Sequence, residues 1–164
     1  MSDPNELTID IATEHDVPQI LGFIRALAEY ERLADSVVAT EEGLRATLFG
    51  PRPYAECVIA RFKGGPAGFA LFFHNYSTFL GRPGVYLEDL FVKPDFRGKG
   101  VGRALLQYLA KVALDRNCGR LEWSVLDWNA PAIGFYKSLG AEPMEDWTIF
   151  RLKGEALARL AGAN

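Results

Sequence analysis

Three glycines stand at alternate positions near the middle of the chain, in the segment Arg97-Gly98-Lys99-Gly100-Val101-Gly102. An apolar, strand-like stretch ends shortly before it, at Pro94, and a strongly periodic helix pattern follows it. Glycines let neighbouring backbone amides crowd together and point one way, at the positive end of a helix dipole. The segment therefore predicts a loop that grips a pyrophosphate group without a metal.

The spacing within this loop excludes two common nucleotide-binding motifs. The dinucleotide pattern G-x-G-x-x-G fails because Arg103 and Leu105 stand where its last glycine would be. The P-loop pattern G-x-x-x-x-G-K-[S/T] does not occur in the sequence. The segment fits R-x-x-G-x-G instead. A plain helix entry is the alternative, but three alternate glycines lose conformational entropy that such an entry does not require.

Glu88 is the second candidate for chemistry, because its neighbours from 85 to 92 are otherwise mostly apolar. A charge in such a strand is costly unless it faces a cleft, where a carboxylate can act as a base or anchor a cation. The structural alternative is an edge carboxylate in a salt bridge or turn. In a regular strand, Asp89 points to the opposite face from Glu88.

The elements that must position these groups follow from hydrophobic periodicity and turn residues. We expect two helices to begin after the N-cap residues Thr13 and Thr40. We expect helices to end at Gly50 and Gly140, and Pro131 suits the first turn of a helix. We expect strands at 7–11, 57–62, 68–73, 85–92, 121–126 and 147–152, and helices at about 17–31, 40–48, 101–112 and 130–139. This order predicts one α/β domain over residues 1–164, with a mixed sheet flanked by helices, a core at about 7–152 and a short helical tail.

Composition fits a globular protein of this kind, with 49% hydrophobic and 24% charged residues. No apolar run approaches the roughly 20 residues of a membrane helix, and the N-terminus lacks the pattern of a secretion signal. Cys57 and Cys118 do not have the spacing of metal ligands. We expect both to be reduced thiols and the protein to be cytoplasmic. A net charge of −3 argues against nucleic acid as a partner. His15 and His74 are expected at the surface or in packing, and no metal site is predicted.

Four blocks of the sequence together resemble the GNAT acyltransferase superfamily, and within it the diamine (spermidine/spermine) and thialysine N-acetyltransferases. The blocks are Ala28-Glu29-Tyr30-Glu31, Tyr86 to Val92, Arg97 to Gly102, and Trp128-Asn129-Ala130-Pro131 with Phe135-Tyr136-Lys137. They occur in the family's order and span nearly the full length. The resemblance implies a central, mostly antiparallel twisted sheet flanked by helices, and acetyl-CoA as the cofactor, with coenzyme A as product.

The resemblance also implies which residues hold acetyl-CoA. Amides from Gly98 to Arg103 would cradle the pyrophosphate, with positive charge added by Arg97 and Lys99, and main-chain groups of strand 85–92 would pair with the pantetheine arm. The implied cofactor-binding residues are Leu90, Phe91, Val92, Arg97, Gly98, Lys99, Gly100, Val101, Gly102, Arg103, Asn129 and Tyr136. Asn129 has an equal alternative role as the N-cap of its helix.

Two residues carry the catalytic roles in this resemblance. Tyr136 is the implied acid, since a phenol with an ordinary pKa of about 10 stays protonated at neutral pH and can donate to a thiolate. Its structural alternative is a tyrosine packed beside Phe135. Glu88 is the implied base, directly or through water, and the site must also lower the pKa of the attacking amine.

The acceptor is implied by the residues of the family's substrate site, of which all but the tyrosine are anionic: Tyr30, Glu31, Glu88, Asp89 and Glu145. They favour a small cationic primary amine, such as a polyamine, a diamine or a lysine analogue such as thialysine, that attacks acetyl-CoA directly in a ternary complex. The family also implies a homodimer. Two alternatives stay open: a GNAT enzyme for another amine, such as an amino acid or an antibiotic, and a catalytically idle acyl-CoA-binding module.

Overall fold

The computed structural model describes residues 6–163. These residues form two units, one that ends at Ser124 and one that begins at Val125, and each is described by itself. No helix within the described range is both long and apolar enough to cross a membrane.

The first unit is built on a five-stranded sheet in the order β1-β2-β3-β4-β5. Its strands are β1 (Leu7–Ile11), β2 (Glu56–Phe62), β3 (Gly65–Ser77), β4 (Arg82–Val92) and β5 (Leu121–Trp123). The first four pair antiparallel in chain order, and β5 pairs parallel to β4. The predicted mixed, mostly antiparallel sheet is therefore confirmed, although β5 ends at Trp123 and is shorter than the predicted strand 121–126.

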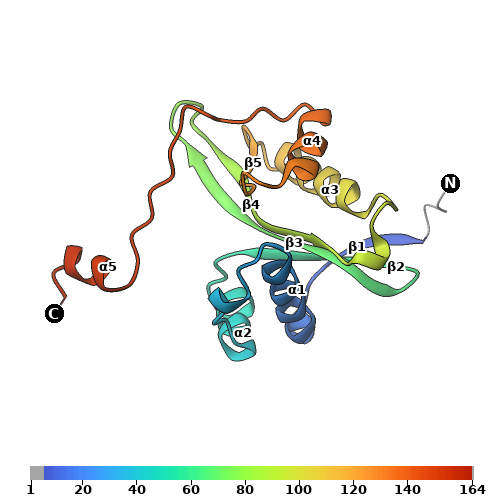
Figure 1. Cartoon of the computed structure of the whole chain (residues 1–164), viewed down its shortest axis with the longest axis horizontal. Coiled ribbons are helices and arrows are strands. Elements are labelled where there is room, and N and C mark those ends of the chain that lie inside the picture. The colour runs from blue at the N-terminus through green and yellow to red at the C-terminus, as the bar shows by residue number, and fades with distance from the viewer. Residues whose placement is uncertain (1–5, 164) are drawn as a thin grey trace. The chain divides into compact units, whose positions relative to one another are not determined.

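Helices cover both faces of this sheet. Figure 1 shows α1 (Val17–Tyr30) and α2 (Glu41–Phe49) on one face and α3 (Val101–Asp115) on the other. As predicted, Thr40 caps α2, where its hydroxyl accepts a hydrogen bond from the Gly43 amide at 3.0 Å. Three short 3₁₀ turns, at Glu14–Asp16, Ala34–Ser36 and Pro94–Phe96, connect the elements.

The core between α1 and the sheet includes apolar side chains that recur at helical spacing and therefore lie on one face of α1. Ile20 and Phe23 of α1 pack against a set of buried sheet residues that includes Cys57, Ile59, Phe69 and Phe91. On the other face, Leu105 and Leu109 of α3 are fully buried. Removing such side chains from water is the main stabilising contribution to this arrangement.

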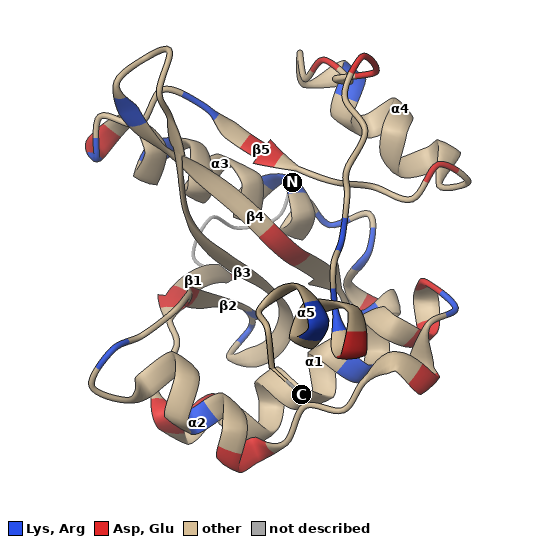
Figure 2. Ribbon diagram, turned by 90° about the vertical axis from the view of Figure 1, so that its left-hand side faces the viewer, with Lys and Arg blue, Asp and Glu red and all other residues tan. Residues whose placement is uncertain are grey.

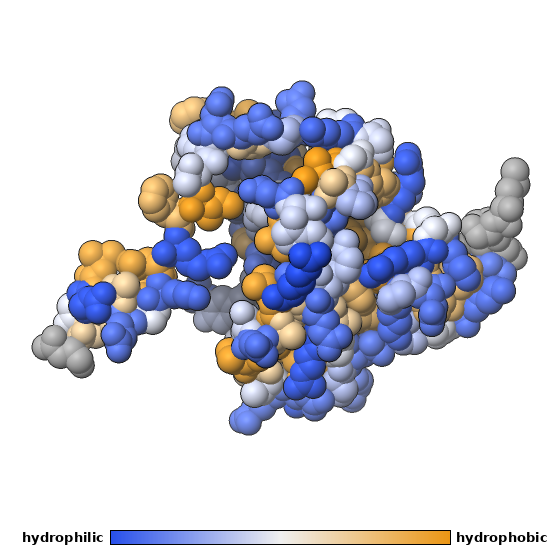
Figure 3. Space-filling model, viewed as in Figure 1, coloured by the Kyte–Doolittle hydropathy of each residue, from blue (hydrophilic) through white to orange (hydrophobic). Residues whose placement is uncertain are grey.

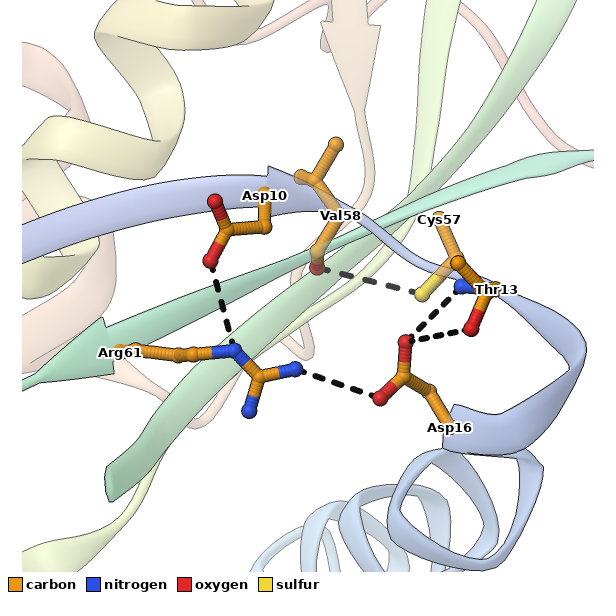
Figure 4. Close-up of polar contacts among 6 residues, drawn as sticks. All are labelled: Asp10, Thr13, Asp16, Cys57, Val58 and Arg61. Carbon is orange, nitrogen blue, oxygen red and sulfur yellow. Dashed lines mark hydrogen bonds and ion pairs between the residues drawn. The ribbon is translucent and has the colours of Figure 1, made fainter. Parts of the chain in front are cut away.

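Arg61 of β2 ties the N-terminal strand to the start of α1 (Figure 4). Its Nε lies 3.3 Å from Asp10 on β1, and its Nη2 lies 3.2 Å from Asp16 in the turn before α1. Asp16 also accepts a hydrogen bond from the Thr13 amide at 2.8 Å. The first strand and the first helix are thus joined through one guanidinium.

The second unit contains α4 (Ala130–Ser138) and α5 (Gly154–Leu160). The residues between these helices form no strand, so the predicted strand 147–152 is wrong. Trp147, Ile149 and Phe150 are instead 76%, 76% and 93% exposed. An extended segment becomes a strand only when another strand accepts its hydrogen bonds, and none does so within residues 6–163. The space-filling view shows apolar residues exposed at the C-terminal helix as well (Figure 3), where Leu160 is 78% exposed.

Candidate active site

The glycine loop connects β4 to α3 and has a left-handed backbone at two of its glycines. Gly98 and Gly100 have φ angles of 76° and 80°, and Gly100 is the N-cap of α3. A Cβ atom built on either glycine meets no atom within 4 Å, so the space above the loop is open. Gly102 already lies in the helix. The first N–H groups of α3 have no acceptor within the helix, which makes this end suited to an anion.

Both cations of the loop lie over aromatic rings. The Arg97 guanidinium is 5.2 Å from the ring centroid of Tyr30 and 5.9 Å from that of Phe91. The Lys99 ammonium is 5.0 Å from the ring of Phe62. These contacts fix where the two positive charges lie beside the loop. A contact between these charges and a pyrophosphate stays a prediction.

The edge of β4 beyond Leu87 is open on the side of β5. The two strands pair over only three positions, from Val85 with Leu121 to Leu87 with Trp123. In the described part of the first unit, β4 residues after this point pair only with β3. The main-chain groups of Leu90 and Val92 therefore lie on a strand edge that an extended ligand can join. The Phe91 side chain is buried in the core, and Phe91 pairs with Phe69 of β3, so its contact with a cofactor stays a prediction.

A bulge in β4 brings Glu88 and Asp89 to the same side of the strand. Leu71 on β3 pairs with Asp89, but the next residue, Phe72, pairs with Leu87, so Glu88 is an extra residue without a partner. Both carboxylates line one cavity. The opposite orientation expected for a regular strand does not apply here, because the bulge interrupts the alternation of side chains. Figure 2 shows acidic residues in the middle of β4.

This cavity has a volume of about 340 Å³ and combines an apolar wall with three carboxylates. It is lined by Ile24, Leu27, Ala28, Glu31, Leu33, Ser36, Val37, Glu88 and Asp89. The sequence reading found Glu31, Glu88 and Asp89. It missed Leu33, Ser36 and Val37, because the segment after α1 has no periodicity that indicates which side chains face inward.

Two of these carboxylates, Asp89 and Glu31, have raised pKa values. Burial raises the pKa of Asp89 to about 6, with further contributions from the nearby charges of Glu88 and Glu31. Burial, and then Glu88, also raises the pKa of Glu31. Within residues 6–163, no arginine, lysine or histidine forms an ion pair with any of the three. A cation in the cavity would relieve this repulsion.

Three predicted site residues belong to the second unit. Asn129 is the N-cap of α4, where its side-chain oxygen accepts a hydrogen bond from the Ala132 amide at 3.4 Å. Tyr136 lies on α4, with its ring centroid 5.9 Å from that of Phe135. Glu145 is exposed in the segment that follows. The roles of these residues toward cofactor and substrate stay predictions.

His74 takes part in a polar network that the sequence reading did not find. Its Nδ1 donates to the Gly84 carbonyl at 2.9 Å, so its Nε2 accepts from Arg116 at 3.0 Å. Arg116 also binds both carboxylate oxygens of Glu56, which lowers the pKa of Glu56 and raises that of Arg116. The network joins the start of β2 to the end of α3. The residues are too distant in sequence for their spacing to have indicated it.

No group of three or more histidine, cysteine, aspartate or glutamate side chains suited to a metal ion occurs among the described residues. The site consists of an open strand edge, an amide-rich loop and an acidic cavity on one strand and its flanking helices. This arrangement can bind an extended anion along β4 and a small cation beside it.

Comparison with known proteins agrees with this geometry. The chain is 44% identical over 162 residues to a thialysine N-epsilon-acetyltransferase of Bos taurus, covering 92% of this chain and 95% of that protein. It is 34% identical to an L-ornithine N5-acetyltransferase of Arabidopsis thaliana, covering 95% and 88%. An integron cassette protein of V. cholerae has the same fold, with a TM-score of 0.81 and 28% identity over 96% of this chain and 99% of that one. The model of the acetyltransferase (GNAT) family matches residues 24–141, most of the chain and part of both units. The chain therefore belongs to the acetyltransferase (GNAT) family.

Proposed function

We propose that this chain transfers an acetyl group from acetyl-CoA to a primary amine of a small cationic acceptor: a polyamine, a diamine or a lysine analogue such as thialysine. The observation that carries the proposal is the cavity in which Glu31, Glu88 and Asp89 meet without an ion-pair partner among the described residues. Its apolar wall suits an aliphatic chain, and its acids suit ammonium groups. The names of the thialysine and ornithine enzymes support the same class of acceptor.

The residues present fit acetyl-CoA, which supplies an activated acetyl thioester. The open edge of β4 at Leu90–Val92 can pair with the amides of a pantetheine arm. The amides from Gly98 to Arg103 lie at the N-terminus of α3, in open space suited to a pyrophosphate. The acidic cavity also lies along β4, so both substrates would meet on one strand and react directly in a ternary complex.

Two side chains would move protons in this reaction. Glu88, in the cavity, would accept a proton from the ammonium of the acceptor, directly or through water, so that the neutral amine attacks the thioester carbonyl. Tyr136 would donate a proton to the departing thiolate, as the family pattern around Asn129 and Tyr136 suggests. We further propose that the two units act as one domain, because the family match spans both.

We also propose that the active protein is a homodimer. The support is the exposed apolar segment around Trp147, Ile149 and Phe150, which has the sequence of a strand. A second copy of the chain would cover such exposed apolar surface. Light scattering after gel filtration should give the mass of a dimer, and a lower mass for Trp147→Ser/Phe150→Ser. A monomeric mass for the parent at micromolar concentration would contradict the proposal.

The activity is tested by thiol release from acetyl-CoA with a panel of acceptors: polyamines, thialysine, ornithine, amino acids and aminoglycosides. We expect turnover with cationic amines, and a loss of about 10²- to 10⁴-fold in kcat for Glu88→Gln and for Tyr136→Phe. The matched controls are Glu142→Gln and Tyr76→Phe, which change exposed residues outside the cavity and the loop. Unchanged turnover in Tyr136→Phe across pH would refute its role as the acid.

The same panel separates the alternatives. A preference for an amino acid or an aminoglycoside over polyamines and lysine analogues would assign the chain to another acceptor class. Binding of coenzyme A without turnover of any amine would identify an idle acyl-CoA-binding module.

A further inference from the structure

The side chain of Arg97 connects the glycine loop to the two elements that carry the acidic cavity. Its guanidinium lies over the ring of Tyr30, the last residue of α1, at 5.2 Å. Its Nε donates to the carbonyl of Val92, the last residue of β4, at 3.3 Å. Glu31 follows Tyr30 directly, and β4 carries Glu88 and Asp89. One side chain of the glycine loop therefore contacts both elements that carry the cavity, at Tyr30 and Val92, which lie next to its lining residues and not among them.

We propose that Arg97 and Tyr30 are positioning residues that couple the two binding sites, so that coenzyme A bound at the loop strengthens the binding of a cationic amine in the cavity. This inference rests on the function proposed above. The loop that bears Arg97 is built from glycines and is held to α1 by the cation–π contact. An anion on the loop amides fixes the position of Arg97, and Arg97 in turn fixes the end of α1 beside Glu31.

We expect the coupling to be positive because binding of either ligand reduces the conformational freedom of the same residues. A first ligand that restrains the loop and the end of α1 leaves less freedom for the second ligand to remove, which gives positive coupling. The coupling is reciprocal, so the amine must strengthen coenzyme A binding by the same factor. Tyr30 is 40% exposed, and a cation–π contact at an exposed site corresponds to about 2- to 5-fold in affinity.

The test measures the Kd of spermidine by calorimetry, with and without saturating coenzyme A, and the Kd of coenzyme A with and without spermidine. Tyr30→Leu removes the ring, whereas Tyr30→Phe keeps it. Arg97→Gln and the double variant Tyr30→Leu/Arg97→Gln complete a mutant cycle. Tyr54→Leu is the matched control, because Tyr54 lies under Arg52 at 5.9 Å in a similar exposed contact outside the cavity and the loop.

We expect coenzyme A to strengthen spermidine binding in the parent, and Tyr30→Leu to reduce that enhancement by about 2- to 5-fold. The enhancement should persist in Tyr30→Phe and Tyr54→Leu, and the double variant should show no further loss beyond either single variant. In each variant, the factor by which coenzyme A strengthens spermidine binding must equal the factor by which spermidine strengthens coenzyme A binding.

Three results in the variants would overturn the inference. Full coupling in Tyr30→Leu would exclude the ring contact, a loss in Tyr30→Phe would assign the effect to the hydroxyl, and an equal loss in Tyr54→Leu would make it nonspecific. A parent that turns over amines but binds spermidine equally with and without coenzyme A would reject the coupling and leave the proposed function standing. A parent that binds neither ligand would reject both.

Discussion

The ring of Phe23 on α1 stacks on the ring of Phe69 on β3, with centroids 5.1 Å apart and an angle of 6° between their planes. Phe91 of β4 meets Phe23 in a tilted contact at 6.3 Å. These buried rings fix the helix that ends at Tyr30 against the strand that carries Glu88 and Asp89. The geometry of the acidic cavity therefore depends on an aromatic contact inside the core.

Replacing this aromatic contact should weaken the whole fold. Phe23→Ala leaves a cavity beside Phe69 and should lower the free energy of unfolding by about 3–5 kcal/mol. Urea denaturation followed by circular dichroism measures the change. Leu114→Ala, at a side chain that is 79% exposed, is the control and should stay within about 0.5 kcal/mol of the parent. A Phe23→Ala variant as stable as the control would contradict the assigned packing.

Amine binding should strengthen as the pH rises from 5 to 7, because Asp89 has a pKa of about 6 in the folded protein. Its ordinary pKa is lower, so between about pH 4 and 6 the folded state holds a proton that the unfolded state has lost. The contribution of Asp89 to stability therefore falls as the pH rises through this window. Above it, Asp89 is ionised and attracts a cation.

Calorimetry with spermidine at pH 5, 6 and 7 measures this dependence. Asp89→Asn should flatten it and weaken binding at pH 7, while the free energy of unfolding at pH 7 should rise because a buried charge is removed. Asp115→Asn, an exposed residue at the end of α3, is the control. A pH dependence that survives in Asp89→Asn would assign the titration to another group.

The glycines of the loop should respond differently to alanine. Gly100 has a φ of 80°, so Gly100→Ala should lower the free energy of unfolding by about 1–2 kcal/mol. A Cβ at Gly102 would meet only the Val92 side chain at 3.7 Å, an ordinary contact, and Gly102→Ala should be neutral or stabilise by roughly 0.4–1 kcal/mol. Denaturation in the absence of coenzyme A measures both. A Gly100→Ala variant as stable as Gly102→Ala would show that the left-handed backbone is not required.

The Cys57 thiol should be unreactive in the folded protein. Burial raises its pKa to about 12, with smaller contributions from Asp16 and Asp89, and the side chain is 5% exposed. The thiolate that reacts with a disulfide reagent is therefore scarce at neutral pH. We expect the dithionitrobenzoate reaction of Cys57 in a Cys118→Ser variant to be slow in the native state and fast in guanidinium chloride. Fast native labelling would mean that β2 opens readily.

The sequence predicted the elements whose signals are local. The glycine loop, the start of α2 at Thr40 and the buried stripe of α1 each depend on residues within a few positions of one another. The shared orientation of Glu88 and Asp89 could not be predicted in this way, because the bulge is defined by pairing with Leu71 and Phe72 on another strand. The contact of Arg116 with Glu56 likewise joins distant segments.

The error at 147–152 has a related cause. Alternating apolar residues indicate that a segment can form a strand, but they do not supply the partner whose backbone completes it. The segment keeps its apolar side chains exposed among the described residues. Its pattern is compatible with a strand, but no pairing partner follows from that pattern.

Because of the bulge at Glu88, the number of carboxylates that face the cavity depends on the length of β4 as well as on its residue types. A β4 strand shorter by that one residue would pair regularly with β3, and neighbouring side chains would then alternate between the two faces of the sheet. Such a strand would present one carboxylate to the cavity instead of two. A single-residue deletion, with no substitution at all, would thus lower the number of carboxylates around the cavity from three to two, Glu31 and one residue of β4.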